Sequence, residues 1–210
     1  MKTDNTISFR SRSYEIRRAD DIARAVTKKY PMISSSKISS FPKANLFSET
    51  IDRIDNKLGK TRMDAIKALS AYNFDVTPKD KILNFLKIMK KDKLGNCAEM
   101  TNLASIFAFL KGIKNTTRAD IKNKAEEFID HIVLYVDNDK KPYIIDPWLG
   151  FADYLPNAIQ RYKSEFSSFF PFNLATSQDF MFRKYKYPCD AKKALNECTA
   201  SDLLKIRKSI

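Results

Sequence analysis

One stretch, residues 95–112 (GNCAEMTNLASIFAFLKG), constrains the fold more than any other part of the chain. Its first glycine interrupts the preceding segment, and Asn96 is a preferred helix N-cap residue. Glu99 follows three positions after Asn96, as in a capping box. The next residues are apolar on most sides, which predicts a buried helix, and the final glycine marks its end. We therefore expect a central helix that begins at Cys97.

The position of Cys97 predicts a chemical role for its thiol. The first backbone N–H groups of a helix have no helical partner, and the helix dipole is positive there. Both features favour the thiolate, which is the nucleophilic form of cysteine. A merely buried cysteine is the ordinary alternative, so a catalytic role requires a base elsewhere in the chain.

Composition limits the class of protein. The chain has 210 residues, of which 43% are hydrophobic, enough for one domain with a core. No apolar run approaches the roughly 18–20 residues of a membrane span, and residues 1–18 lack the apolar region of a cleaved signal peptide. The chain has three cysteines without a C-x-x-C pair and a single histidine. We therefore expect no disulfide scaffold, no metal and no organic cofactor.

The net charge of +13 suggests either nucleic acid or an anionic membrane as a partner. The sequence has no RNP-like, zinc-finger or helix-turn-helix signature, and charges of both signs are spread along it. A solvated basic surface is the preferred interpretation, with no nucleic acid bound and an acidic protein surface as a fitting partner. A non-catalytic basic binding protein is the alternative from another functional class.

The pattern of the chain predicts helices before and after the central one. They are expected at 19–30, in two pieces between 48 and 69 interrupted at Gly59, at 78–91, at 119–128 and at 201–208. Residues 115–117 are expected to form a loop. Residues 1–48 form either a loose lead-in, usable as an export segment, or a small helix packed on the main domain at 49–210.

A hairpin supplies the partners for Cys97. Strands are expected at 132–136 and 143–145 around a turn of polar residues, with one further strand at 185–187. A turn centred between positions 138 and 139 places His131 opposite Asp146, with Cβ atoms about 5 Å apart. The aspartate can then fix the imidazole tautomer and stabilise the imidazolium, although a one-residue slip would separate the two. Taken alone, His131 is most simply a structural histidine, and Asp146 is a common type of residue at the end of a strand. Together with Cys97 they predict a Cys–His–Asp triad.

Three motifs in this order resemble those of papain-like and transglutaminase-like thiol enzymes: GNCAE (95–99), DHIVLYV (130–136) and YIIDPW (143–148). Within that group they are most similar to the bacterial toxin and effector glutamine deamidases, such as the C-terminal domain of the Pasteurella multocida toxin and related type III effectors. The resemblance covers roughly the middle quarter of the chain. It lacks the papain-type glutamine before the cysteine, since residues 90–94 read KKDKL.

The resemblance implies an α+β papain-like fold, with the cysteine helix packed on a small antiparallel sheet. It implies that Cys97 is the nucleophile, His131 the general base and acid, and Asp146 its orienting partner. The implied activity is deamidation of a glutamine on a host protein, by an effector secreted without a cleaved signal peptide into the host cytoplasm. A thiol protease or a transglutaminase would use the same triad. Trp148 is expected either to line the substrate cleft or to pack in the core.

Overall fold

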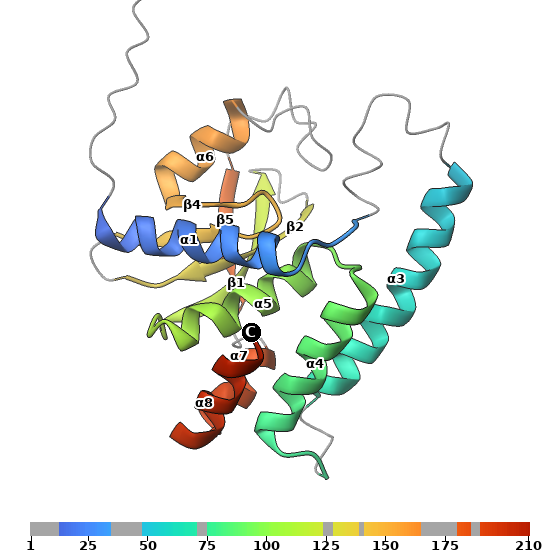
Figure 1. Cartoon of the computed structure of the whole chain (residues 1–210). Coiled ribbons are helices and arrows are strands. Elements are labelled where there is room, and N and C mark those ends of the chain that lie inside the picture. The colour runs from blue at the N-terminus through green and yellow to red at the C-terminus, as the bar shows by residue number, and fades with distance from the viewer. Residues whose placement is uncertain are drawn as a thin grey trace, which may run out of the picture.

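The computed structural model describes residues 13–34, 48–70, 75–123, 128–138, 141–164, 180–185 and 190–210. In these ranges the chain is α+β and contains one five-stranded antiparallel sheet, shown with the helices around it in Figure 1. The strands are β1 (Thr116–Asn123), β2 (Phe128–Val136), β3 (Tyr143–Asp146), β4 (Phe151–Tyr154) and β5 (Phe180–Lys184). Their order across the sheet is β4-β3-β2-β1-β5.

The described helices surround this sheet. They are α1 (Tyr14–Lys29), α3 (Ser48–Leu69), α4 (Pro78–Asp92), α5 (Cys97–Leu110), α6 (Leu155–Ser164), α7 (Asp190–Asn196) and α8 (Ala200–Ser209). The helices expected at 19–30, 78–91 and 201–208 are therefore confirmed as α1, α4 and α8. None of the described helices is long and apolar enough to cross a membrane.

The central helix α5 begins at Cys97, as predicted, and ten of its residues are buried. It packs against β2 and β1, and α1 and α7 contact it from other sides. In Figure 1, α1 and α5 both lie in front of the strands, while α3 and α4 form a pair beside the sheet. The buried helix thus connects the sheet to the other helices, as its apolar sequence requires.

The predicted hairpin is present, but its register differs from the prediction. The prediction pairs Leu134 with Tyr143, whereas the ladder between β2 and β3 pairs Leu134 with Ile145. The difference is two residues, and side chains alternate between faces with a period of two. His131 and Asp146 therefore stay on the same face of the sheet.

Two helix predictions are wrong. Of the segment expected as a helix at 119–128, residues 119–123 belong to strand β1, which begins at Thr116 inside the expected loop, and Phe128 begins β2. Residues 124–127 lie outside the described ranges. β1 is hydrogen-bonded to β2 on one side and to β5 on the other, so pairing with distant strands decides its conformation. Gly59 does not interrupt α3, which runs unbroken to Leu69. A single glycine costs a helix only about 1 kcal/mol, and α3 packs along α4. Of the strand expected at 185–187, only Tyr185 is described, just after β5.

The N-terminal segment packs on the main domain. Helix α1 contacts β3, β4 and α5, and Asp20 accepts a hydrogen bond of 3.1 Å from the Ala152 N–H. The chain then continues beside the start of α5, where Ile33 and Leu94 form a parallel bridge. Residues 13–34 therefore fit the packed-helix interpretation, whereas residues 1–12 and 35–47 lie outside the described ranges.

A close contact at Gly95 holds this segment against the cysteine helix. The Gly95 N–H donates to the Ile33 carbonyl at 3.3 Å, and a Cβ added to Gly95 would lie 2.4 Å from the Met32 sulfur. No side chain is tolerated there unless Met32 moves.

We expect Gly95→Ala to lower the free energy of unfolding by about 1 kcal/mol, because the added methyl displaces Met32. Met32→Ala should reduce the cost of the same glycine change, since the sulfur is then absent and only the Glu99 Cβ, at 3.2 Å, still crowds the methyl. Urea unfolding of both single variants and the double variant measures this coupling. Additive effects of the two changes would contradict the contact.

Candidate active site

The structure brings Cys97, His131 and Asp146 together from three different elements. His131 lies in β2, Asp146 is the last residue of β3, and His131 Nε2 is 2.6 Å from Asp146 Oδ2. Both side chains are at most 1% exposed. The Cys97 side chain lies near the same imidazole, whose pKa it raises. Because Nε2 faces Asp146, Nδ1 is the ring nitrogen left for the sulfur. The three side chains thus form one connected chain.

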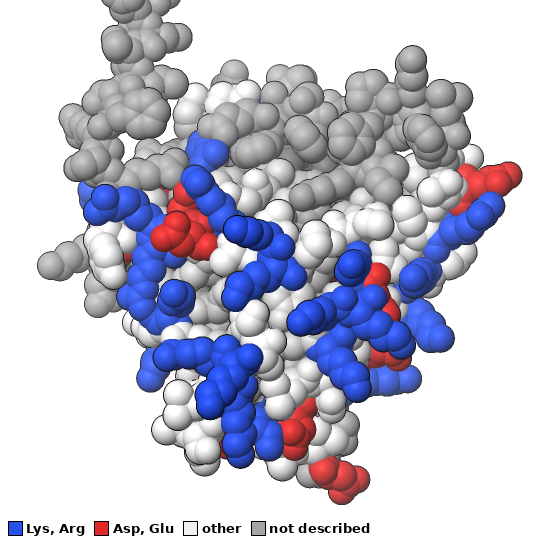
Figure 2. Space-filling model, in the orientation of Figure 1, with Lys and Arg blue, Asp and Glu red and all other residues white. Residues whose placement is uncertain are grey.

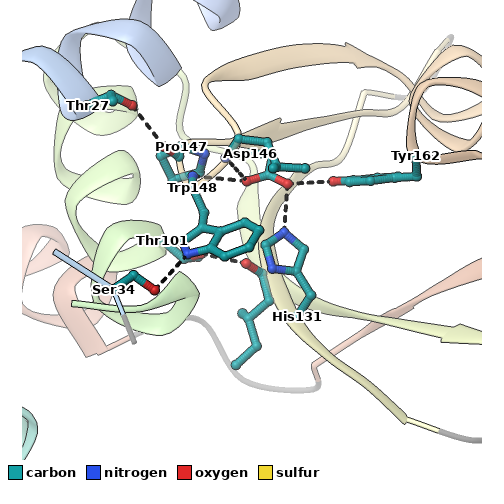
Figure 3. A network of polar contacts seen from close by, with 10 residues as sticks. Thr27, Ser34, Thr101, His131, Asp146, Pro147, Trp148 and Tyr162 are labelled. Carbon is teal, nitrogen blue, oxygen red and sulfur yellow. Dashed lines mark hydrogen bonds and ion pairs between the residues drawn. The ribbon is translucent and has the colours of Figure 1, made fainter. Parts of the chain in front are cut away.

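Asp146 is held by four hydrogen bonds, several of which are drawn in Figure 3. Its Oδ2 atom accepts from His131 and from the Tyr162 hydroxyl at 2.8 Å. Its Oδ1 atom accepts from the backbone N–H groups of Trp148 and Leu149, each at 3.0 Å. Burial alone would raise the pKa of the carboxyl, but the charge and hydrogen bond of His131, with the Leu149 and Tyr162 bonds, lower it. The group is therefore a carboxylate at neutral pH.

The sequence DPWLG (146–150) explains this geometry locally. An aspartate readily accepts from N–H groups two and three residues later, which turns the chain after β3. The turn is closed by a 2.8 Å bond from the Gly150 N–H to the Asp146 carbonyl, and Gly150 has φ of +78°. Only glycine adopts that conformation without strain. Helix α1 fixes the turn from outside, because Thr27 donates to the Pro147 carbonyl at 2.9 Å.

The buried imidazole is held in its charged form. Burial by itself lowers the pKa of His131, but the charge and hydrogen bond of Asp146, followed by those of Cys97, raise it to about 10. The helix that carries the cysteine also fixes β2 beside the histidine, because Thr101 donates to the Ile132 carbonyl at 3.0 Å. The site can therefore hold a proton at His131 near the sulfur at neutral pH.

Trp148 covers the imidazole and lies in the core. Its ring centroid is 5.1 Å from that of His131, and the residue is only 2% exposed. Its Nε1–H donates to Ser34 Oγ at 3.3 Å, and Ser34 donates in turn to Asn96 Oδ1 at 2.6 Å. Of the two roles expected for Trp148, core packing is the one that this burial fits.

Two residues of this site, Ser34 and Tyr162, were not predicted. Tyr162 and Ala158 are buried one turn apart on α6, so an apolar periodicity marks the inner face of that helix. Nothing in that pattern indicates that the hydroxyl meets Asp146. Ser34 belongs to a polar tract that resembles a loop, and no sequence signal connects it with Asn96.

The start of α5 is capped as expected. The Glu99 carboxylate accepts the Asn96 N–H at 2.9 Å and also binds Arg62 Nε at 2.9 Å. Glu99 therefore has a structural role beside the cysteine. Among the described residues, no group of three or more histidine, cysteine or acidic side chains is placed to hold a metal ion.

Cys97 borders a cavity of about 320 Å³. Its walls come from six elements: α3, α4, α5, β1, β2 and α7. The residue is 8% exposed and lines this cavity, and its side chain also lies near the imidazole. A substrate group in the cavity would therefore lie next to the sulfur.

No protein-family model matches the chain, and a search of the curated proteins finds no significant match. The function of the protein is therefore proposed from the geometry of the site.

We expect a thiol-directed probe such as iodoacetamide to label Cys97 at least about ten times faster than Cys198 at pH 7. Cys198 is a free thiol whose pKa is raised to about 11, first by burial and then by nearby acidic groups. Peptide mass spectrometry of a Cys189→Ser protein measures both rates. His131→Ala should abolish the preference, and equal rates in the unaltered site would contradict it.

The charged pair also predicts a pH dependence of stability. An unfolded histidine has a pKa of about 6.5, so below that pH both states hold the proton and the stabilisation is complete. Above it only the folded state holds the proton. The free energy of unfolding should then fall by at most about 1.4 kcal/mol per pH unit, until the proton is lost near the folded pKa of about 10.

Urea unfolding at pH 7, 8 and 9 tests this dependence. The comparison is between Cys97→Ala and Cys97→Ala with Asp146→Asn, so that the thiol titrates in neither protein. The asparagine variant should show the flatter profile, because burial without a carboxylate disfavours the imidazolium. Parallel profiles would show that Asp146 does not hold the proton on His131.

Proposed function

We propose that this protein is a cysteine hydrolase of the papain-like and transglutaminase-like group that deamidates a glutamine on a protein partner. One observation carries the proposal. The thiol at the first position of a buried helix lies near an imidazole, and that imidazole is 2.6 Å from a buried carboxylate. A cysteine helix packed on an antiparallel sheet supports the assignment to this group. So does the position of the three motifs, at the start of α5, within β2 and at the end of β3.

The first step is attack of the Cys97 thiolate on the carbon of the glutamine carboxamide. A carbon–sulfur bond forms, and the carbonyl electrons move to oxygen. The first helical hydrogen bond of α5 runs from the Met100 N–H to the Asn96 carbonyl at 3.1 Å. The N–H groups of Cys97 and Ala98 precede it and have no helical partner, so they are the donors proposed for the oxyanion.

The second step releases ammonia. His131 gives its proton to the departing nitrogen, the carbon–nitrogen bond breaks, and a thioester remains on Cys97. The now neutral imidazole takes a proton from water, whose oxygen attacks the thioester and displaces the sulfur. The products are glutamate and ammonia. A neutral amide thus becomes a carboxylate, which changes the charge of the partner's surface.

The burial of the charged pair supports catalysis over a purely structural role. A buried ion pair is often no more stabilising than apolar residues of the same volume, so its presence needs another reason. Strongly perturbed ionisable groups are often found at active sites, and Cys97, which lies near this pair, lines the cavity. In the view of Figure 2, Lys and Arg side chains are spread over the described surface and interspersed with acidic ones. A distributed positive charge suits attraction of an acidic protein surface.

The partner and the setting are proposed from the resemblance of the three motifs. The substrate would be a host protein that presents a glutamine, and the protein would act in the host cytoplasm as a secreted bacterial effector. A protease or a transglutaminase with the same three residues would differ in what leaves and what attacks the thioester. The products distinguish these reactions.

Incubation of a host-cell extract with the protein should add about one mass unit at a specific glutamine, because the amide NH2 group is replaced by an OH group. High-resolution peptide mass spectrometry identifies the site, and Cys97→Ala is the control. A gain that persists with Cys97→Ala would contradict the proposal. Cleaved peptides would indicate a protease, and amine adducts would indicate a transglutaminase.

A further inference from the structure

The cavity beside Cys97 has one apolar wall and one polar wall. The apolar wall is formed by Ala65 and Leu69 of α3, Phe85 of α4 and Ile132 of β2. The volume of the whole cavity, about 320 Å³, lies at the lower end of the range for ligand sites. A cavity of this character next to a nucleophile can receive an apolar side chain together with a few polar atoms.

The polar wall holds two buried atoms without hydrogen-bond partners. Arg118 Nε, a donor, and Asn102 Oδ1, an acceptor, are the two such side-chain atoms found among the described residues. Both residues line the cavity. Native proteins rarely leave buried polar atoms unsatisfied, so each such atom requires an explanation, and a ligand is one.

The other charged groups of this wall already have partners. Arg62 binds Glu99 at 2.9 Å, and Asp190 lies 3.5 Å from Lys193. The Arg118 guanidinium lies over the Tyr185 ring, 5.3 Å from its centroid, a contact that positions it without using an N–H group. Arg118 is therefore positioned and still has a hydrogen bond to give.

We propose that this cavity is a subsite for the polypeptide around the target glutamine. Arg118 donates to a main-chain carbonyl, Asn102 accepts a main-chain N–H, and the apolar wall receives an apolar side chain adjacent to the glutamine. This inference rests on the proposed function and specifies its substrate as a glutamine within a polypeptide. Free glutamine has neither a neighbouring side chain nor a peptide group to offer.

A peptide group fits the wall better than an acidic side chain does. It carries both an acceptor and a donor, so it satisfies Arg118 and Asn102 together. A carboxylate offers only acceptor oxygens at neutral pH and would also lie near Asp190, which lines the same cavity.

The kinetic test uses acetylated, amidated pentapeptides with a central glutamine followed by leucine, aspartate or glycine, and free glutamine as a fourth substrate. Ammonia release should be fastest with the leucine peptide. Arg118→Gln should raise the KM for the leucine peptide about ten-fold and leave kcat nearly unchanged, since the lost hydrogen bond lies away from the reacting carbon. Arg53→Gln on the exposed part of α3 is the matched control and should leave both constants unchanged.

A binding test separates this subsite from the deamidase reaction itself. Fluorescence anisotropy of the labelled leucine peptide with Cys97→Ala protein needs no turnover. Asn102→Leu should weaken binding, yet it should not destabilise the fold, because it replaces an unpartnered buried acceptor with an apolar group of similar size. Thermal unfolding of each variant confirms that the fold is kept.

The outcomes distinguish the two proposals. If no peptide releases ammonia but the leucine peptide binds and Arg118→Gln weakens its binding, deamidation is contradicted and the subsite is supported. A preference for the aspartate peptide that disappears in Arg118→Gln would overturn the subsite in favour of a carboxylate site. Kinetics and binding that are both insensitive to Arg118 and Asn102 would also overturn it.

Discussion

The hydrogen bond between His131 and Asp146 is the interaction on which the rest of the site depends. Two charged groups that are at most 1% exposed must be paired, because neither would remain ionised alone in such an environment. Their neighbours serve this pairing. The Tyr162 hydroxyl and two backbone N–H groups donate the remaining hydrogen bonds to the carboxylate, and Trp148 covers the imidazole. The sulfur of Cys97 then meets an imidazole whose orientation and charge are already fixed.

Each member of the triad is positioned by an element that also belongs to the core. Cys97 begins the most buried helix, and Asp146 ends a strand whose four residues are all buried. Helix α1 and residues 31–34 join these elements from outside, through Thr27 to the turn after β3 and through Ser34 to Asn96 and Trp148. The stability of the fold and the geometry of the site are therefore linked. A loss of packing at the N-terminal segment would also disturb the position of Cys97.

Local signals in the sequence were enough to predict the parts of the site that depend on neighbouring residues. The helix start at Cys97, its cap at Glu99 and the hairpin between His131 and Asp146 all follow from short motifs and alternation. Contacts between distant segments were not predictable in the same way. Strand β1 also pairs with β5, far along the chain, and the hydrogen bond from Ser34 to Asn96 crosses 62 positions. The Tyr162 hydroxyl crosses only 16 positions to Asp146, but no short motif marks this contact. Propensity carries no information about such partners.

The hydroxyl of Tyr162 has a consequence for the order in which the protein matures. During synthesis the cysteine helix and the hairpin leave the ribosome before this tyrosine does, because translation runs from the N-terminus. Until α6 emerges and docks, the aspartate lacks one of its four hydrogen bonds, and the imidazole is less firmly held. The nascent chain thus holds Cys97 beside an incompletely hydrogen-bonded His131–Asp146 pair until α6 has emerged and docked.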